Sequence, residues 1–252
     1  ITLDQMGKYT ANAYIAIEDK RFYEHSGVDI LRTGKATLSY LLNKGSSDVG
    51  GGSTITQQLV KNTTQEKDRT WQRKVKEMAK AIQIENMLSK DQILELYLNM
   101  IFVGGNGIHG VALGAEYYFN KDVSELDLAE CAFLAGINHT PNSYNIFIAQ
   151  DEGEEKVNEV NELIKKRTKT VLSKMKELGK IKTEEEYLQA VKEVEAGLNF
   201  NKGAFPQTVF SYHTDAAINQ IIAQLQKEHD WTYKQAKLYL SSGGFTIYTT
   251  QN

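Results

Sequence analysis

Two glutamates, Glu18 and Glu77, are the residues of this chain best suited to chemistry. Glu18 directly follows the apolar run 13–17, and Glu77 ends the cationic segment Arg73-Lys74-Val75-Lys76-Glu77. A carboxylate can take the proton of an attacking alcohol. Cations can stabilise the charge of a departing pyrophosphate. The pair therefore favours transfer of a glycosyl group from a sugar pyrophosphate to an alcohol.

Glu18 is our candidate for the general base. Partial burial at the end of an apolar helix would raise the pKa of its carboxyl toward the working range of a base. The spacing alone also fits a helix-end glutamate paired with Lys20 or Arg21, and this alternative stays open. Asp19 fits a second acid, a hydrogen-bond partner or a helix cap, and His25 fits a donor to a carboxylate or a turn; we expect supporting roles for both.

A glycine-rich segment, 45–52, leads into a polar helix start. The segment is predicted to be a loop, because glycine loses the most backbone entropy on ordering. Ser53, Thr54, Gln57 and Gln58 follow it with hydroxyls, amides and free N–H groups, which suit an anion or a sugar. The segment is not a phosphate-binding P-loop, since no Gly-Lys-Ser/Thr follows.

Arg73, Lys74 and Glu77 share one face of a predicted helix over 70–88, because they lie three and four residues apart. They fit an ordinary surface ion pair, which contributes less than about 1 kcal/mol. They also fit a site in which cations meet a pyrophosphate, for which the planar fork of arginine is well shaped.

Five motifs in this order resemble those of the peptidoglycan glycosyltransferases of family 51, the domain found in class A bifunctional penicillin-binding proteins. The resemblance covers about residues 1–200. The motifs are Glu18-Asp19-x-x-Phe22-x-x-His25-x-Gly27, Gly52-Ser53-Thr54-Ile55-Thr56-Gln57-Gln58, Arg73-Lys74-x-x-Glu77, Ile93-Leu94-Glu95-x-Tyr97-Leu98-Asn99 and Gly107-x-x-Gly110 followed by Tyr118-Phe119. Within the fifth motif, His109 stands where the family often has an aromatic residue.

The resemblance implies polymerisation of lipid II with release of undecaprenyl pyrophosphate, and inhibition by moenomycin-type phosphoglycolipids. It implies that Glu77 orients cations or binds a divalent ion, Mg²⁺ or Mn²⁺, and no organic cofactor is expected. Catalysis is assigned to Glu18 and Glu77. Substrate binding is assigned to Asp19, His25, Ser53, Thr54, Gln57, Gln58, Lys61, Asn62, Arg69, Arg73 and Lys74.

The expected fold is mainly α and lysozyme-like, with a larger helical lobe and a smaller membrane-proximal lobe. Helices are predicted over 70–88 and 155–178, and four capping boxes begin at Thr54, Ser89, Thr183 and Thr232. We predict a glycosyltransferase domain over 1–200 and, over 201–252, a short α/β segment that leads toward a transpeptidase. Its strands are expected at 207–212 and 245–250.

The composition limits which classes of molecule this protein is expected to bind. A formal charge of −3 and a pI near 6.0 give no global basic field, so nucleic acid is not expected. Cys131 is predicted to be a small buried hydrophobe.

The amphipathic segment 30–42 fits either the core or the membrane surface, and the resemblance favours the membrane. It also implies the outer face of the bacterial cytoplasmic membrane, with an N-terminal transmembrane anchor outside this sequence.

Two rival functions remain. A lysozyme-like lytic glycosidase would also use a glutamate, but its leaving group carries no pyrophosphate, so the cations around Glu77 argue against it. A catalytically silent module that recruits division or elongation proteins is the second rival.

Overall fold

The computed structural model describes residues 1–34, 52–64, 70–105, 107–203, 212–242 and 247–248. Several predicted features lie outside these ranges: residues 45–51 of the glycine-rich segment 45–52, Arg69, residues 35–42 of the amphipathic segment, and residues 207–211, 245–246 and 249–250 of the predicted strands. The helices and strands are α1 Thr10–Glu18, α3 Ile55–Thr64, α4 Trp71–Met87, α5 Lys90–Met100, β1 Phe102–Gly104, β2 Ile108–His109, α6 Val111–Phe119, α7 Leu128–Ile137, α8 Ile146–Glu152, α9 Glu154–Glu177, α10 Glu184–Ala196, α11 Tyr212–His229 and α12 Tyr233–Ser242. The predicted mainly α class is confirmed for the described residues.

The backbone forms two compact units, Ile1–Ala204 and Phe205–Asn252, and each is described by itself. The described part of the second unit consists of α11 and α12, which pack against each other. Tyr212 begins α11, and Ile247 and Tyr248 are not in a strand, so at these positions the predicted strands are wrong.

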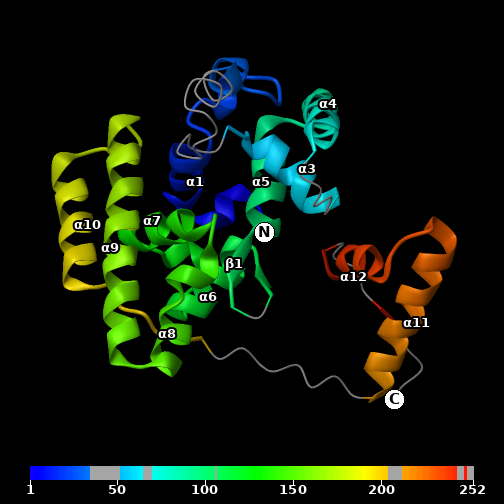
Figure 1. Cartoon of the computed structure of the whole chain (residues 1–252). Coiled ribbons are helices and arrows are strands. Elements are labelled where there is room, and N and C mark those ends of the chain that lie inside the picture. The colour runs from blue at the N-terminus through cyan, green and yellow to red at the C-terminus, as the bar shows by residue number, and fades with distance from the viewer. Residues whose placement is uncertain (35–51, 65–69, 106, 204–211, 243–246, 249–252) are drawn as a thin grey trace. The chain divides into compact units, whose positions relative to one another are not determined.

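Helix α7 is the centre of the first unit, because every one of its residues is buried. It begins with a capping box, in which the Asp127 side chain accepts from the Glu130 N–H at 2.8 Å and the Glu130 side chain accepts from the Asp127 N–H at 3.1 Å. Helices α1 and α9 pack on α7 (Figure 1). Cys131 is buried here as predicted, and burial raises the pKa of its thiol to about 12.

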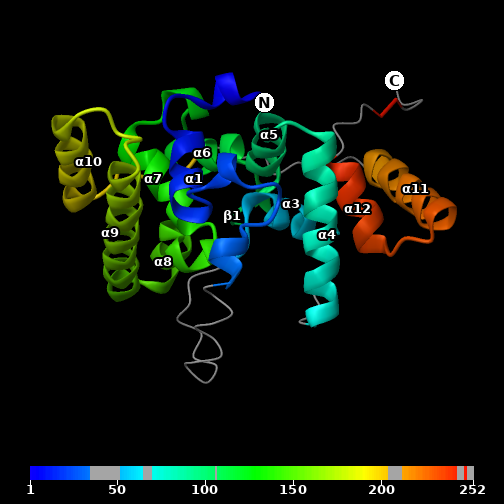
Figure 2. The ribbon, with the colours of Figure 1, turned by 90° about the horizontal axis from the view of Figure 1, so that it is seen from above.

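Helix α3 packs on α4 and on α5 (Figures 1 and 2). The loop that follows α1 reaches α4 through Gly27, which has φ +88°; a Cβ at this position would lie 2.7 Å from the Ala81 main chain. Glycine is therefore required for this close approach. Its carbonyl accepts a hydrogen bond from the Thr54 hydroxyl at 2.6 Å, which ties the start of α3 to the same loop.

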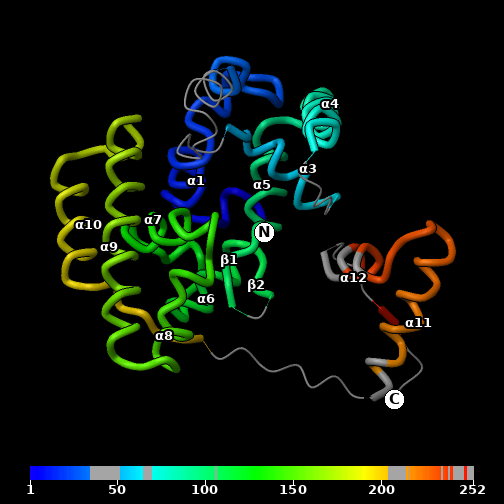
Figure 3. The backbone as a smooth tube through the Cα atoms, in the orientation of Figure 1, coloured from blue at the N-terminus to red at the C-terminus, as the bar shows by residue number. Residues whose placement is uncertain are grey.

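The chain runs from α4 through α5 into an antiparallel pair, β1 and β2, as Figure 3 shows. Helix α6 follows, and its Tyr118 and Phe119 meet Phe133, Phe147 and Phe200 in one aromatic cluster. The Asn201 N–H donates to the Tyr118 carbonyl at 2.9 Å. The segment after α10 is thus packed onto the first unit.

The predicted helix boundaries are close to those observed, since α4 and α9 begin and end within one residue of 70–88 and 155–178. The capping boxes at Thr54, Ser89 and Thr232 have both hydrogen bonds. At Thr183 one of the two is present, because the Glu186 carboxylate accepts from the Lys182 N–H instead. No described helix combines the length and the apolar composition that crossing a bilayer demands.

Candidate active site

A cleft of about 320 Å³ brings Glu18 and Glu77 together, although they are far apart in the sequence. Five parts of the chain contribute to it: the end of α1, α3 with the residues just before it, α4, β1, and the residues just after α7. Its lining residues are Glu18, Ser53, Gln57, Gln58, Lys61, Asn62, Glu77, Phe102, Asn138 and His139. The two carboxylates and Lys61 therefore face one shared space.

Glu18 is the last residue of α1, whose apolar side buries Ala13, Tyr14 and Ile15. The helix ends there because Asp19 leaves the helical conformation, and the Arg32 guanidinium donates to the Glu18 carbonyl. The half-buried Glu18 carboxylate accepts one hydrogen bond, from Gln58 Nε2 to Oε2 at 2.8 Å. No pairing of Glu18 with Lys20 or Arg21 is present among the described contacts.

Asp19 and His25 lie beneath the cleft. Asp19 is fully buried, and its Oδ2 accepts from the Ile55 N–H at 3.0 Å and lies 2.9 Å from His25 Nε2. A carboxylate beside the first N–H groups of a helix is favourable because the helix dipole is positive there. These contacts hold the start of α3 and leave Asp19 no exposed surface for the substrate contact that was expected.

The start of α3 presents a polar face to the cleft. Thr54 caps the helix from a fully buried position, so its contacts too are structural. Gln57 Nε2 is buried and has no hydrogen-bond partner in the described part of the chain, while its residue lines the cleft. Gln58, Lys61 and Asn62 follow at helical spacing and line the same wall.

Glu77 gathers the cations of the site. It is 4% exposed, its Oε2 lies 2.6 Å from Arg73 Nη1, and its Oε1 is paired with Lys74 Nζ. Lys74 also donates to the Ser53 hydroxyl at 2.8 Å. Ser53 lines the cleft, so Arg73 and Lys74 adjoin its edge without being among the lining residues. The cluster therefore has a buried carboxylate at its centre and two half-buried cations around it, unlike an ion pair between exposed side chains.

The surroundings of Glu77 do not suit a divalent cation. Both carboxylate oxygens are occupied by Arg73 and Lys74, and a cation needs several oxygen ligands. Within the described ranges, no group of three His, Cys, Asp or Glu side chains gathers to hold a metal. The residues around Glu77 therefore do not fit Mg²⁺ or Mn²⁺.

Three further residues form part of the wall of the cleft and were not predicted from the sequence: Phe102, Asn138 and His139. Burial, followed by the charge of Arg167, lowers the pKa of His139, so this wall carries no fixed positive charge near neutral pH. The available signal was the polar pair Asn138-His139 directly after the apolar run 131–137, which ends α7.

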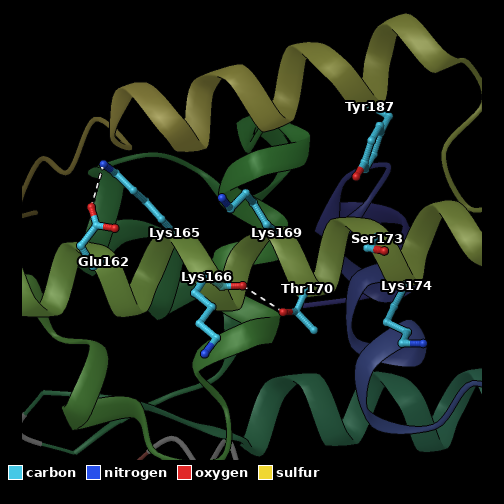
Figure 4. Close-up of a pocket in the computed structure, with 8 residues that line it drawn as sticks. All are labelled: Glu162, Lys165, Lys166, Lys169, Thr170, Ser173, Lys174 and Tyr187. Atoms are coloured by element: carbon cyan, nitrogen blue, oxygen red, sulfur yellow. Dashed lines mark hydrogen bonds and ion pairs between the residues drawn. The ribbon is translucent and has the colours of Figure 1, made fainter.

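A second cavity, of about 460 Å³, lies on α9 and α10 and is lined by lysines (Figure 4). Lys165 is paired with Glu162 at 3.1 Å, and Lys174 with Glu177 at 2.6 Å. The Thr170 hydroxyl donates to the Lys166 carbonyl at 2.9 Å. Acidic side chains on the same helix thus compensate two of its lysines.

Comparison with known proteins adds an independent line of evidence. The family model described as Transglycosylase matches residues 1–176. Penicillin-binding protein 1A of Clostridium perfringens (strain 13 / Type A) is 40% identical over 245 residues, which are 95% of this chain and 35% of the relative. Penicillin-binding protein 1F of Bacillus subtilis (strain 168) is 35% identical over 247 residues, which are 98% of this chain and 31% of the relative.

Among solved structures, penicillin-binding protein 1A from Haemophilus influenzae aligns with a TM-score of 0.37 and 25% identity, over 70% of this chain and 21% of that one. The chain spans about a third of the length of the curated relatives it matches. The family expected from the five motifs is confirmed.

Proposed function

Because the chain belongs to the transglycosylase family, we propose that it polymerises lipid II into the glycan strands of peptidoglycan. The observation that carries this proposal is the single cleft lined by Glu18, Glu77 and Lys61. A base for the incoming alcohol and cations for the leaving group must both reach one sugar, and this arrangement allows it.

Glu18 takes the proton of the 4-hydroxyl of the acceptor's GlcNAc. The hydroxyl oxygen attacks the anomeric carbon of the lipid-linked sugar of the growing chain, and the bond from that carbon to the pyrophosphate oxygen breaks. Attack from the opposite face inverts the anomeric carbon and gives a β-1,4 linkage. The hydrogen bond from Gln58 Nε2 to Glu18 Oε2 holds the carboxylate in the cleft for this step.

Lys61, Arg73 and Lys74 meet the departing undecaprenyl pyrophosphate. These three cations outnumber the single carboxylate of Glu77, so the group has a net positive charge that attracts an anion. Glu77 holds Arg73 and Lys74 in place before the reaction, and such preorganised charge is an effective way to stabilise a leaving group. We assign Arg69 the same role from the family motif.

The whole protein is proposed to be a bifunctional penicillin-binding protein, in which a transpeptidase follows this chain. We place it at the outer face of the bacterial cytoplasmic membrane, held by an N-terminal anchor, where its lipid-linked substrate resides. Moenomycin-type phosphoglycolipids are expected to bind the cleft, since they carry a phosphate and sugars as the donor does. Division or elongation proteins are its expected partners.

The reaction class is tested by giving the full-length protein lipid II in one assay and cross-linked cell wall in another. We expect polymer from lipid II and no soluble muropeptides from the wall. Release of muropeptides without polymer would replace the proposal by a lytic glycosidase. Inactivity in both assays, with the protein folded and membrane-anchored, would favour a recruitment module.

A further inference from the structure

Three hydrogen bonds in series connect Glu18 to Asn138, which lines the same cleft. Asn138 Nδ2 donates to the Tyr97 hydroxyl at 2.8 Å, and the Tyr97 hydroxyl donates to Gln58 Oε1 at 3.2 Å. Gln58 Nε2 in turn donates to Glu18 Oε2 at 2.8 Å. The four residues come from the end of α1, from α3, from α5 and from the chain just after α7. We call this series the Asn138–Glu18 relay.

The direction of each hydrogen bond is fixed by the one before it. Asn138 Nδ2 donates to the hydroxyl oxygen of Tyr97, so this oxygen acts as an acceptor toward Asn138. The hydroxyl proton of Tyr97 then points toward Gln58. Gln58 Oε1 accepts the hydrogen bond from the Tyr97 hydroxyl, so the oxygen end of that amide faces Tyr97 and its NH₂ end faces Glu18. Hydrogen bonds in such a series polarise one another, and this effect is strong where water is excluded.

Tyr97 is suited to the middle of this relay because it is fully buried on α5 and cannot exchange its partners for water. Burial, followed by the negative charge of Glu18, raises the pKa of Tyr97 far above its usual value, so the hydroxyl keeps the proton that it donates. Tyr14 resembles it closely: it is fully buried, its pKa is raised by the same two causes, and its ring meets that of Tyr97 edge-on at 6.2 Å. The Tyr14 hydroxyl, however, donates to the Leu134 carbonyl at 3.0 Å and does not join the relay.

We propose that Tyr97 and Asn138 are positioning residues for the reaction: through the relay they hold the Gln58 amide with its NH₂ group on Glu18, and so keep the base ionised. The inference rests on the proposed function, in which Glu18 is the base. Neither residue needs to touch the reacting atoms for this role. If the relay is cut at Tyr97, the Gln58 amide can turn over and present its oxygen to Glu18, and two oxygens face each other favourably only when the carboxyl is protonated.

Other titratable and charged groups lie around Glu18. They are Tyr14 on its own helix, Asp19 and Arg32 beyond that helix, Lys61 on α3, Glu77 on α4 and His139 after α7. The variant Tyr97→Phe leaves all of them in place and removes one hydroxyl. Tyr14→Phe does the same at an equally buried position next to Glu18, so it is the matched control.

The test measures lipid II polymerisation by the full-length protein between pH 5 and pH 8, as kcat/KM, for the unmutated protein and the two phenylalanine variants. In Tyr97→Phe, loss of the Tyr97 hydroxyl should move the acidic limb of the plot of kcat/KM against pH upward by about one pH unit. At a pH below this limb, kcat/KM should therefore fall about tenfold. Tyr14→Phe should keep the original limb, even if both variants lose similar thermal stability. A merely structural role for Tyr97 would lower the whole profile without moving the limb.

Asn138→Ala is the second variant, and it decides the matter if Tyr97→Phe does not fold. It leaves the Tyr97 hydroxyl free to turn away from Gln58, so we expect a smaller upward movement, of about half a pH unit. The proposal is overturned if the folded relay variants keep the original limb, or if Tyr14→Phe moves it as far. Glu18→Gln in the same series separates the two ideas, because polymerisation by that variant would reject the proposed base, whereas an inactive Glu18→Gln with unmoved limbs would reject the relay alone.

Discussion

At the residue scale, Glu77 shows what one buried carboxylate does for the cations around it. Its two oxygens hold Arg73 and Lys74, and Lys74 reaches Ser53 in the cleft. Glu77→Gln should therefore lower kcat of lipid II polymerisation by more than about tenfold, because the cations lose their fixed positions at the leaving group. It should also cost about 1–3 kcal/mol of unfolding free energy, since the donors lose their partner.

The variant Glu85→Gln, on the same helix, is the control. Glu85 accepts from the Thr56 hydroxyl at 2.6 Å and from Lys90 at 2.8 Å, and it does not line the cleft. An equal loss of activity in both variants would contradict a special role for Glu77.

At the element scale, the start of α3 determines where Gln57 and Gln58 lie, and Asp19 holds that start through the Ile55 N–H. Asp19→Asn removes the negative charge beside the helix N-terminus, which should cost about 1 kcal/mol of unfolding free energy. Because α3 also carries Gln58, polymerisation should fall more than this loss of stability explains. Asp127→Asn, at the capping box of α7, is the matched control; it should show a similar shift in thermal unfolding and retain activity. Equal activity of the two variants at matched stability would contradict this view of α3.

At the scale of the whole molecule, the chain divides into two compact units, and Phe200 belongs to the first. It stacks on Phe119 with ring centroids 5.5 Å apart and meets Phe133 at 5.0 Å. A fragment of residues 1–203 should unfold cooperatively, whereas a fragment of residues 1–198 should be less stable by about 2 kcal/mol, because it loses the half-buried ring. Denaturant unfolding of the two fragments measures the difference. Equal stability would mean that the aromatic cluster does not complete the first unit.

Much of the helical organisation could be predicted because its signals are local. The capping boxes at Ser89 and Thr232 and the ends of α4 and α9 depend on residues within a few positions of one another. The side of α4 that faces solvent could not be predicted: Trp71 is 72% exposed, while Glu77 is buried. Here an ionic cluster, and not the apolar stripe, faces the rest of the unit.

The candidate site could be predicted only in part, because some of its contacts join residues that are far apart in the sequence. Glu18, Gln58 and Glu77 lie in motifs that resemble a family, so their shared cleft could be expected. Asn138 comes from a different part of the chain, and its contact with Tyr97 spans 41 positions in the sequence. No local pattern marks such a pair. Asp19 was expected to bind substrate, and no local pattern shows that it is fully buried, with Ile55 and His25 as its neighbours in space.

The most direct test of the whole account is lipid II polymerisation by Glu18→Gln in the full-length, membrane-anchored protein, measured together with binding of lipid II. Glutamine keeps the shape of the side chain and cannot take the proton of the acceptor hydroxyl, so the rate should fall by at least about a hundredfold. Binding of lipid II should stay within about threefold of the unmutated protein, since the cations at Glu77 are untouched. Polymerisation at an undiminished rate would contradict the account, because the proton would then be leaving to some other group.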